Sequence, residues 1–483
     1  MSTGERGETG RTSDAFVRIL DGNTFAVSDA NGDIEESTAT ATGMFSFDTR
    51  FLSMWVLTVG QERLQALSVD DLQYYETRFF LVPGGPTHYI DSTISVIRQR
   101  EIVAGLNEKL TVFNHDRTAA RVELRIEVDC DFADLFEVKA GSVRQRDREI
   151  RVEDGVLRYV YRRERWHREV AISSSQPAEV DERGLFWSVD IGPQQSWSTD
   201  LRVHPTIFGG DGRDIRDSLG TGRPRSKAEL QQDLDEWLDR APRLDSDWDL
   251  LVSTYRRSLI DLAALRFTPL TDPRIQMPAA GLPWFMSLFG RDSIFTSLQA
   301  LPFAPDLAAF TIQVLGSGQG VRLDDFREEE PGKILREFRY GELTAFEERP
   351  HSPYFGAADL PALFVVLLDE YERWTGDSST VRYMEPEVRT ALDWIDSYAD
   401  LMGNGYVYYR RRNEQTGLEN QCWKESPDSI SYRDGRIPPA PRATCELQGY
   451  AYDAKRRAAR LAREFWNDPG LADRLEAQAA ELK

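Results

Sequence analysis

The chain has 483 residues and a formal charge of −21, from 59 Lys plus Arg against 80 Asp plus Glu. A polyanion of this kind does not bind nucleic acid by neutralising phosphates. Hydrophobic residues make up 41% and aromatic residues 11% of the chain, which excludes wholesale disorder, and the length predicts two to four domains at roughly 100–200 residues each.

The first part of the chain predicts a β domain. Residues 1–14 are polar, lack the apolar stretch of an export signal, and are expected to form a disordered tail. Over residues 15–205, short segments of alternating or β-branched character recur between turn residues, which is typical of an antiparallel β-sandwich. The expected strands are Phe16–Leu20, Thr24–Ser28, Trp55–Val59, Thr93–Arg98, Glu108–Asn114, Ala120–Val128, Gly155–Tyr161, Arg168–Ser174 and Leu185–Ile191.

The hydrophobic pattern then changes from strand to helix. Residues 206–245 are Gly-rich and polar and predict a linker with a short helix at about Lys227–Asp239. Over residues 246–483, apolar positions recur at three and four residues, which predicts long helices. Seven are expected: Asp247–Leu265, Asp292–Leu301, Pro305–Leu315, Ala358–Trp374, Pro386–Met402, Glu446–Trp466 and Pro469–Leu482.

The loops that enter the second, fourth and sixth helices are long and rich in Trp, Tyr, Gly, Arg and carboxylates. Such loops before every second helix are what a toroid of inner and outer helices requires, with the inner N-termini at one mouth. Aromatic rings stack on sugar rings, and Arg, Asp, Glu and Gln match sugar hydroxyls. Each segment also has a simpler interpretation: Asp292 as a helix N-cap, Tyr354 and Trp423 as core aromatics, and Glu425 and Asp428 as solvated loop carboxylates.

The order of these segments resembles a known family. The segments "LPWFMSLFGRDSIFTSLQAL", "EEEPGKILREFRYGEL", "SPYFGAADLPALFVVLLDEY", "NQCWKESPDSI" and "ATCELQGYAYDA" are similar to those of bacterial and archaeal amylo-alpha-1,6-glucosidases, the glycogen debranching enzyme-like glycoside hydrolases. The segment "ILDGNTFAVSDANGDI" with "TGMFSFDTRFLSMW" resembles the N-terminal domain of that family. The resemblance spans nearly the whole chain.

This resemblance implies a β domain followed by an (α/α)6 toroid that hydrolyses α-glucosidic bonds with inversion. Such hydrolysis needs a carboxylic acid and a carboxylate base about 6.5–9.5 Å apart. By position, Glu425 is the expected general acid and Asp428 the alternative, although the family more often has Asp where Glu425 stands. Residues expected around a bound glucose are Trp284, Arg291, Asp292, Tyr354, Asp359, Trp423, Lys424, Glu446 and Gln448. The acid must be protonated, so we expect Trp423 and nearby carboxylates to raise the pKa of Glu425.

Seven expected helices are fewer than the twelve of such a toroid, and no base carboxylate is found in this chain. We therefore expect a truncated toroid, which a second polypeptide could complete. The expected substrate is an α-glucan or oligosaccharide, with no cofactor and no metal. Two other interpretations stay open: a non-catalytic glycan-binding or scaffold protein, and a toroid hydrolase of small glycosides such as glucosyl- or mannosyl-glycerate.

The composition also gives expectations about the compartment. Seven lysines among the 59 basic residues, together with the acidic charge, are typical of a halophilic protein from a salt-accumulating cytoplasm, or of an ordinary acidic cytosolic protein. Three cysteines without CxxC spacing indicate neither a disulfide framework nor a zinc site. No run of 18 apolar residues occurs, so no membrane span is expected, and the predicted location is cytoplasmic.

Overall fold

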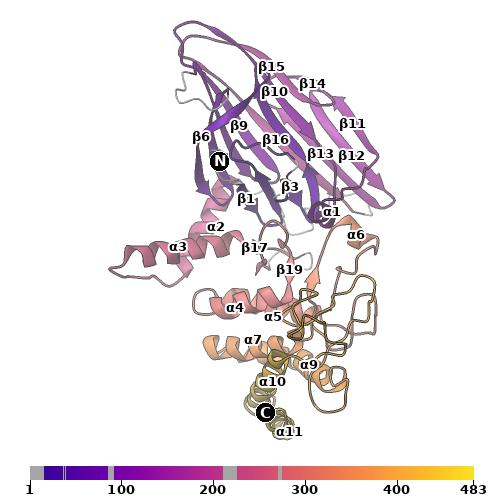
Figure 1. The fold of residues 1–483 in the computed structure, drawn as a ribbon. Helices are drawn as coiled ribbons and strands as arrows, with labels where there is room; N and C mark the ends of the chain where they lie inside the picture. The colour runs from indigo at the N-terminus through magenta and orange to yellow at the C-terminus, as the bar shows by residue number, and fades with distance from the viewer. Residues whose placement is uncertain (1–15, 36, 38–39, 85–91, 210–225, 270–274) are drawn as a thin grey trace, which may run out of the picture. The chain divides into compact units, whose positions relative to one another are not determined.

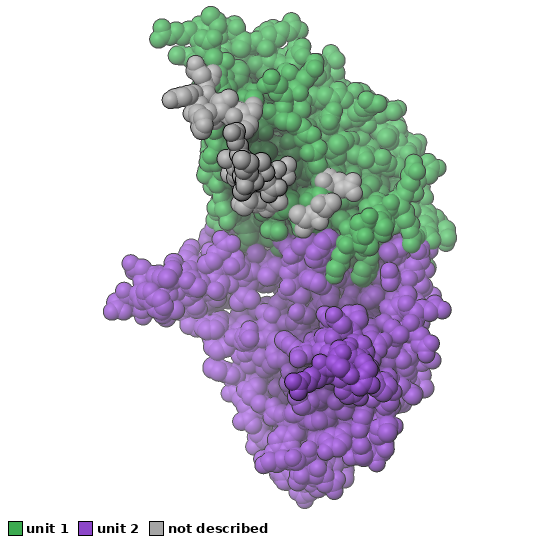
Figure 2. Space-filling model, viewed as in Figure 1, with its two compact units in different colours: residues 1–230 green, residues 231–483 purple. Residues whose placement is uncertain are grey.

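The computed structural model describes residues 16–35, 37, 40–84, 92–209, 226–269 and 275–483. The chain divides into two compact units, the β unit (residues 1–230) and the helical unit (residues 231–483), which Figure 2 shows in different colours. The tail expected over residues 1–14, and residues 210–225 of the expected linker, lie outside the described residues.

The β unit is built almost entirely of strands (Figure 1). Its strands are β1 (Val17–Asp21), β2 (Thr24–Ser28), β3 (Gly43–Ser46), β4 (Thr49–Leu52), β5 (Met54–Val59), β6 (Glu62–Gln73), β7 (Glu76–Pro83), β8 (Ile94–Ile102), β9 (Leu106–Asn114), β10 (Ala120–Asp129), β11 (Arg148–Glu153), β12 (Val156–Arg163), β13 (Trp166–Ser174), β14 (Glu179–Asp181), β15 (Gly184–Ile191) and β16 (Ser196–Phe208). A short helix, α1 (Leu135–Ala140), follows β10, and α2 (Lys227–Arg240) crosses from one unit into the other.

Twelve of these strands form one antiparallel sheet in the order β11-β12-β13-β16-β9-β8-β7-β6-β5-β10-β15-β14, and β1–β4 form a second sheet. The large sheet curls back on itself, so that β14 and β15 at one end contact β12 and β16. The Tyr159 hydroxyl donates to the carbonyls of Val128 at 3.1 Å and Glu182 at 2.9 Å across this contact. The expected antiparallel β domain is therefore present, but its layers arise from one curled sheet, with the four-stranded sheet against β7 and β8.

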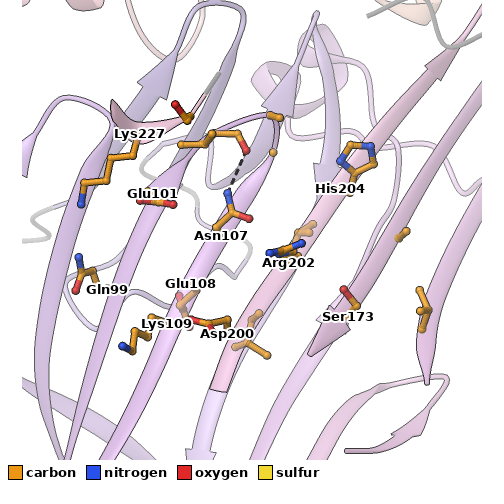
Figure 3. A pocket seen from close by; sticks show the side chains of 18 of the residues that line it. Gln99, Glu101, Asn107, Glu108, Lys109, Ser173, Asp200, Arg202, His204 and Lys227 are labelled. Atoms are coloured by element: carbon orange, nitrogen blue, oxygen red, sulfur yellow. Dashed lines mark hydrogen bonds between the residues drawn. The ribbon is translucent and has the colours of Figure 1, made fainter. Parts of the chain in front are cut away.

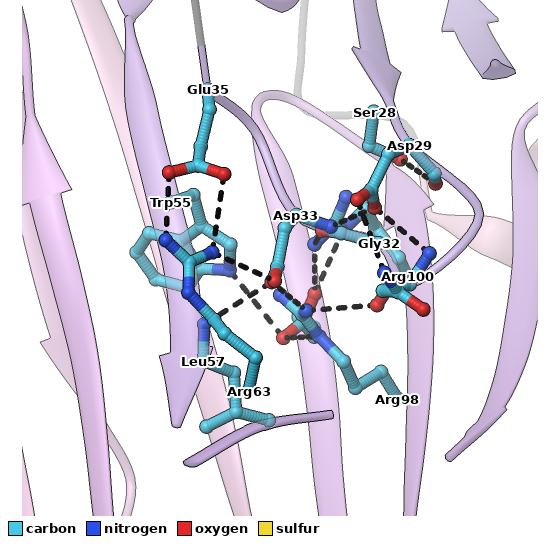
Figure 4. Close-up of polar contacts among 12 residues, drawn as sticks. Ser28, Asp29, Gly32, Asp33, Glu35, Trp55, Leu57, Arg63, Arg98 and Arg100 are labelled. Carbon is cyan, nitrogen blue, oxygen red and sulfur yellow. Dashed lines mark hydrogen bonds and ion pairs between the residues drawn. The ribbon is translucent and has the colours of Figure 1, made fainter. Parts of the chain in front are cut away.

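A network of buried charges joins β8, β9 and the turn after β2 (Figure 4). Arg98 and Arg100 share one face of β8 because side chains alternate along a strand. Glu108 of β9 accepts hydrogen bonds from Arg98 Nε at 2.9 Å and Arg100 Nε at 2.7 Å, and Arg98 Nη1 donates to Asp33 Oδ1 at 2.6 Å. These four side chains are at most 4% exposed. Their pairing fixes the two strands and the turn as one rigid block.

The helical unit carries the long helices and four two-residue strands. The helices are α3 (Asp249–Ala264), α4 (Gly290–Ala300), α5 (Pro305–Ser317), α6 (Glu342–Ala345), α7 (Leu360–Thr375), α8 (Ser378–Tyr383), α9 (Glu385–Ser397), α10 (Cys445–Glu464) and α11 (Pro469–Leu482). The strands are β17 (Arg266–Phe267), β18 (Met277–Pro278), β19 (Leu288–Phe289) and β20 (Glu337–Phe338).

Helix α7 lies at the centre of the helical unit and contacts α4, α5, α9 and α10. Every residue from Leu360 to Asp369 is buried, as expected for a helix with apolar residues all around it. The carboxylate of Asp369 accepts hydrogen bonds at 2.7 Å from Arg373 of α7 and from Arg457 and Arg460 of α10. This pairing joins the two helices.

Each expected helix is present and nearly of the expected extent, but α1, α6 and α8 were not predicted. The seven expected helices correspond to α3, α4, α5, α7, α9, α10 and α11, and the short helix to α2. The fifth is shorter than expected, since α9 ends at Ser397. All nine expected strands are present, but β3, β4, β6, β7, β11, β14 and β16 were not predicted. Among the described residues, no helix has the length and apolarity needed to cross a membrane.

Candidate active site

A short antiparallel ladder brings distant loops of the helical unit together. β19, just before α4, pairs with β20, and Tyr354 pairs with Glu337 of β20 through an N–H to carbonyl bond of 3.0 Å. The Tyr354 carbonyl also accepts from the Arg336 N–H at 2.7 Å. In the same way, the Ala358 N–H donates to the Gln421 carbonyl at 2.7 Å. Four of the segments singled out in the sequence therefore meet at the N-terminal ends of α4 and α7.

Arg291, in the first turn of α4, is the residue on which these segments converge. Its Nε and Nη2 donate to the two carboxylate oxygens of Asp359 at 2.7 and 3.2 Å, a bidentate pair. Nη2 also donates to the Cys422 carbonyl at 3.0 Å, and Nη1 donates to Glu425 Oε2 at 3.0 Å. Because Arg291 and Asp359 are buried, Asp359 holds the guanidinium in place for Glu425.

Glu425 lies between two arginines. Its second oxygen, Oε1, accepts from Arg336 Nη2 at 2.8 Å, while its side chain stays 39% exposed. Partial burial by itself would raise the pKa of Glu425, but Arg336 and Arg291 outweigh it and lower that pKa below its ordinary value. The expected rise of the Glu425 pKa is therefore wrong for the chain as it stands. In the absence of a ligand, this carboxylate is ionised at neutral pH.

The charge network continues through the segment "REFR", which the sequence analysis had given no role. Arg336 pairs with Glu337, and Arg339 Nε donates to Glu337 Oε1 at 3.1 Å. Burial alone would raise the pKa of Glu337, but Arg336 and Arg339 lower it to about 2. Arg339 also donates to the Trp284 carbonyl at 2.8 Å. Asp359, Arg291, Glu425, Arg336 and Glu337 thus form one chain of alternating charges, which we call the arginine–carboxylate chain.

An exposed aromatic ring lies beside this chain. Trp423 is 52% exposed, and its ring meets Phe295 edge-on at 5.2 Å between centroids. The Arg291 guanidinium lies 5.9 Å from the centre of the same ring. Asp292, the next residue of α4, is exposed, and desolvation by neighbouring protein groups raises its pKa against the opposing charge of Arg291. The site therefore combines the exposed ring of Trp423 with two accessible carboxylates, those of Asp292 and Glu425.

Two of the residues expected to contact sugar support the loops instead. Tyr354 is fully buried, and its hydroxyl accepts a bond from the Leu418 N–H at 2.8 Å, so it offers no ring face to a ligand. Gln448 bonds both polar groups of Val407, at 2.8 Å each, and so ties that loop to α10.

The other expected residues differ in their surroundings. Lys424 and Asp428 are exposed, and Trp284 is half-buried. Glu446 in the first turn of α10 has one oxygen, Oε1, that is buried and has no hydrogen-bond partner among the residues that the structure describes. Within the described residues, no group of three or more His, Cys, Asp or Glu side chains is placed to hold a metal ion.

The β unit matches a known family. Residues 19–202 match the N-terminal domain of (some) glycogen debranching enzymes, which confirms the expected resemblance for this part of the chain. No protein of curated function matches the chain by sequence.

Solved structures give a likeness of fold at low sequence identity. A protein described as a candidate kojibiose phosphorylase from the human microbiome aligns with 96% of this chain at a TM-score of 0.57 and 10% identity. The chain spans 66% of that protein's length. A rhamnosidase from Klebsiella oxytoca with rhamnose bound aligns with 80% of this chain and 65% of its own, at a TM-score of 0.33 and 10% identity. The first match indicates that the helical unit has the fold of part of a helical toroid.

Proposed function

We propose that this chain, whose residues 19–202 match the N-terminal domain of some glycogen debranching enzymes, is part of a glycosidase that cleaves α-glucosidic bonds by inverting hydrolysis. In this proposal the helical unit binds the sugar and supplies the general acid. The observation that carries this proposal is the convergence of separate loops on Arg291, beside the exposed ring of Trp423 and the accessible Glu425.

The proposed binding mode follows from the chemistry of these side chains. The free face of Trp423 stacks on the apolar face of a terminal glucose. Asp292 and the two arginines hydrogen-bond its hydroxyls. Trp284 and Lys424 lie in the segments of Asp292 and Trp423, and Glu446 lies in the first turn of α10. Asp359 and Tyr354 act indirectly, since Asp359 orients Arg291 and Tyr354 holds the loop at Leu418.

In this proposal Glu425 becomes the general acid only when sugar is bound. Its low pKa depends on the hydrogen bonds from Arg291 and Arg336. If sugar hydroxyls accept these bonds instead, Glu425 loses the two interactions that favour its charge and is desolvated by the ligand, so its pKa rises. A protonated Glu425 can then donate to the leaving oxygen. Asp428, exposed three residues later, is the alternative acid.

The base carboxylate of the inverting reaction is proposed to come from residues outside this chain. The chain spans 66% of the length of the phosphorylase that it resembles in fold. The complete toroid, its substrate and any second polypeptide that completes it are therefore part of what we propose. The ionised state of Glu425 favours one other candidate, a glycan-binding protein without catalysis, in which Glu425 only accepts hydroxyl hydrogen bonds.

Binding of a branched maltooligosaccharide with one α-1,6-linked glucose tests the proposal. We expect calorimetric titration of the full chain to show binding, and Trp423→Ala to weaken it at least about tenfold. Trp374→Ala is the matched control, because Trp374 is 58% exposed at the end of α7, away from these loops. Equal affinities in the two variants, or no binding to the unmodified chain, would refute the proposed site. Neither candidate predicts turnover by this chain alone, so turnover by the chain once it is completed with the residues that supply the base would distinguish the enzyme from the glycan-binding candidate.

A further inference from the structure

A pocket of about 870 Å³ opens on one face of the large sheet in the β unit (Figure 3). Neighbouring strands β8, β9, β16, β13 and β12 form its floor, and α2 begins at its edge. This size is within the range of about 300–1,000 Å³ that is typical of small-molecule sites. Its polar lining includes Glu101, Lys109, Asp200, Arg202 and His204.

Four charged side chains that line this pocket, Glu101, Lys109, Asp200 and Arg202, do not pair with other described groups of the fold. Lys109 of β9 lies directly opposite Asp200 of β16, and Glu101 and Arg202 lie one step along the same face. Within the described part of the chain, none of these four side chains makes an ion pair or hydrogen bond. Charged groups of opposite sign that are adjacent but unpaired are available to a ligand.

The balance of charge indicates the chemistry of that ligand. Two other cations of the pocket are already neutralised, Lys227 by Glu76 at 2.5 Å and Arg158 by Glu169 at 2.8 Å. The remaining two acids and two bases cancel, so the pocket has no excess positive charge to attract a phosphate. A neutral ligand with many hydroxyls can use donors and acceptors of both kinds at once.

The floor of the pocket is rigid before any ligand binds. Side chains alternate along β8, so Gln99 and Glu101 face the pocket while Arg98 and Arg100 enter the buried network of Figure 4. Glu108 fixes β8 to β9 through both arginines. A preformed surface lowers the entropic cost of binding.

We propose that this pocket of the β unit binds a neutral, hydroxyl-rich oligosaccharide, independently of the Arg291–Glu425 site. The described lining has no Phe, Tyr or Trp, so recognition rests on hydrogen bonds to hydroxyls and not on stacking. Because such contacts compete with water, we expect an affinity of about 1 mM. The choice of maltotetraose as the probe rests on the proposed function; the pocket itself does not.

Histidine NMR of the full chain gives a readout specific to this pocket. The chain has five histidines, and His204 lines the pocket, so its ring signal is assigned by its loss in His204→Gln. Titration with maltotetraose should shift the His204 signal to saturation. Asp200→Asn and Arg202→Gln should each weaken this binding at least tenfold. The control Arg162→Gln removes an exposed arginine of β12 outside the pocket and should leave it unchanged.

Two further measurements distinguish this proposal from the proposed function of the helical unit. Trp423→Ala should leave the His204 titration unchanged, and a shift with cellotetraose but not maltotetraose would support the pocket while counting against an α-glucan substrate. Three outcomes would overturn the inference: no shift of His204 with either sugar at about 20 mM, the same affinity in Asp200→Asn, Arg202→Gln and Arg162→Gln, or a saturating shift with inorganic phosphate alone.

Discussion

Two arginine–carboxylate networks in this protein use the same chemistry in different environments. In the β unit, Glu108 lies between Arg98 and Arg100 and is completely enclosed. In the helical unit, Glu425 lies between Arg291 and Arg336 but is 39% exposed beside Trp423. An enclosed carboxylate cannot exchange its partners without unfolding, whereas an accessible one can exchange them for those of a ligand. The comparison indicates a structural role for the first network and a binding role for the second.

Removing the central carboxylate of the enclosed network should have the largest effect on stability. Glu108→Gln leaves Arg98 and Arg100 buried without a full countercharge, and breaking a buried pair in this way costs about 3–5 kcal/mol. Denaturant unfolding measures this loss. Glu123→Gln, on the exposed face of β10, is the matched control and should stay within about 0.5 kcal/mol of the unmodified chain. A similar small loss for Glu108→Gln would contradict the structural role.

Glu337, the buried end of the arginine–carboxylate chain, should also contribute to stability, in a way that depends on pH. The pKa of Glu337 is about 2 in the folded chain and about 4.5 when unfolded, so its contribution is complete above pH 4.5 and is lost as the pH falls toward 2. The shift corresponds to roughly 3 kcal/mol. Glu337→Gln should therefore flatten the dependence of unfolding free energy on pH between 4.5 and 2. An unchanged slope would show that Glu337 is not held by Arg336 and Arg339.

His351, whose ring is tilted against that of Tyr354 with 4.9 Å between the ring centres, gives a second dependence of stability on pH, in a higher pH range. Burial lowers its pKa from 6.5 to about 4. Below pH 6.5 the unfolded ring takes up a proton that the folded ring takes up only near pH 4, so stability falls as the pH drops through this interval. The loss is at most about 3 kcal/mol, and His351→Gln should reduce it. His115→Gln, at an exposed histidine of the β unit, should not reduce it.

The accessible network should show the smallest effect on stability. Glu425→Gln removes two ion pairs, but solvent screens a carboxylate that is 39% exposed, so we expect a loss below about 1 kcal/mol. The same variant should weaken binding of the branched maltooligosaccharide in calorimetric titration. A loss of stability as large as that of Glu108→Gln, with sugar affinity intact, would make the two networks equivalent and remove the contrast between them.

Periodicity explains which elements the sequence could predict. Strands such as β10 alternate between buried and more exposed positions, and α7 is apolar over its first nine residues, so both have a clear pattern. β6 has no regular alternation, because exposed and half-buried residues follow one another along it. β19 and β20 have two residues each and are too short for any period. The ladder that assembles the site was therefore invisible in the sequence.

The candidate site was predictable as a set of residues but not as a network. Arg291, Asp359 and Glu425 were singled out from their segments, and the structure brings them together. Arg336 was missed because its segment has the composition of a solvated loop. The expected pKa of Glu425 was wrong for the same reason: the reasoning used its neighbours in the chain, while the charge that lowers the pKa most lies 89 residues away.

The direct test of the difference between the two networks is whether sugar binding changes the protonation of Glu425. Calorimetric titration of the branched maltooligosaccharide at pH 5, in buffers with different ionisation enthalpies, measures the protons taken up on binding. We expect an uptake of up to one proton by the full chain, because the ligand replaces Glu425 at Arg291 and Arg336, and none by Glu425→Gln. Binding without proton uptake by the full chain would contradict the claim that this network opens to its ligand.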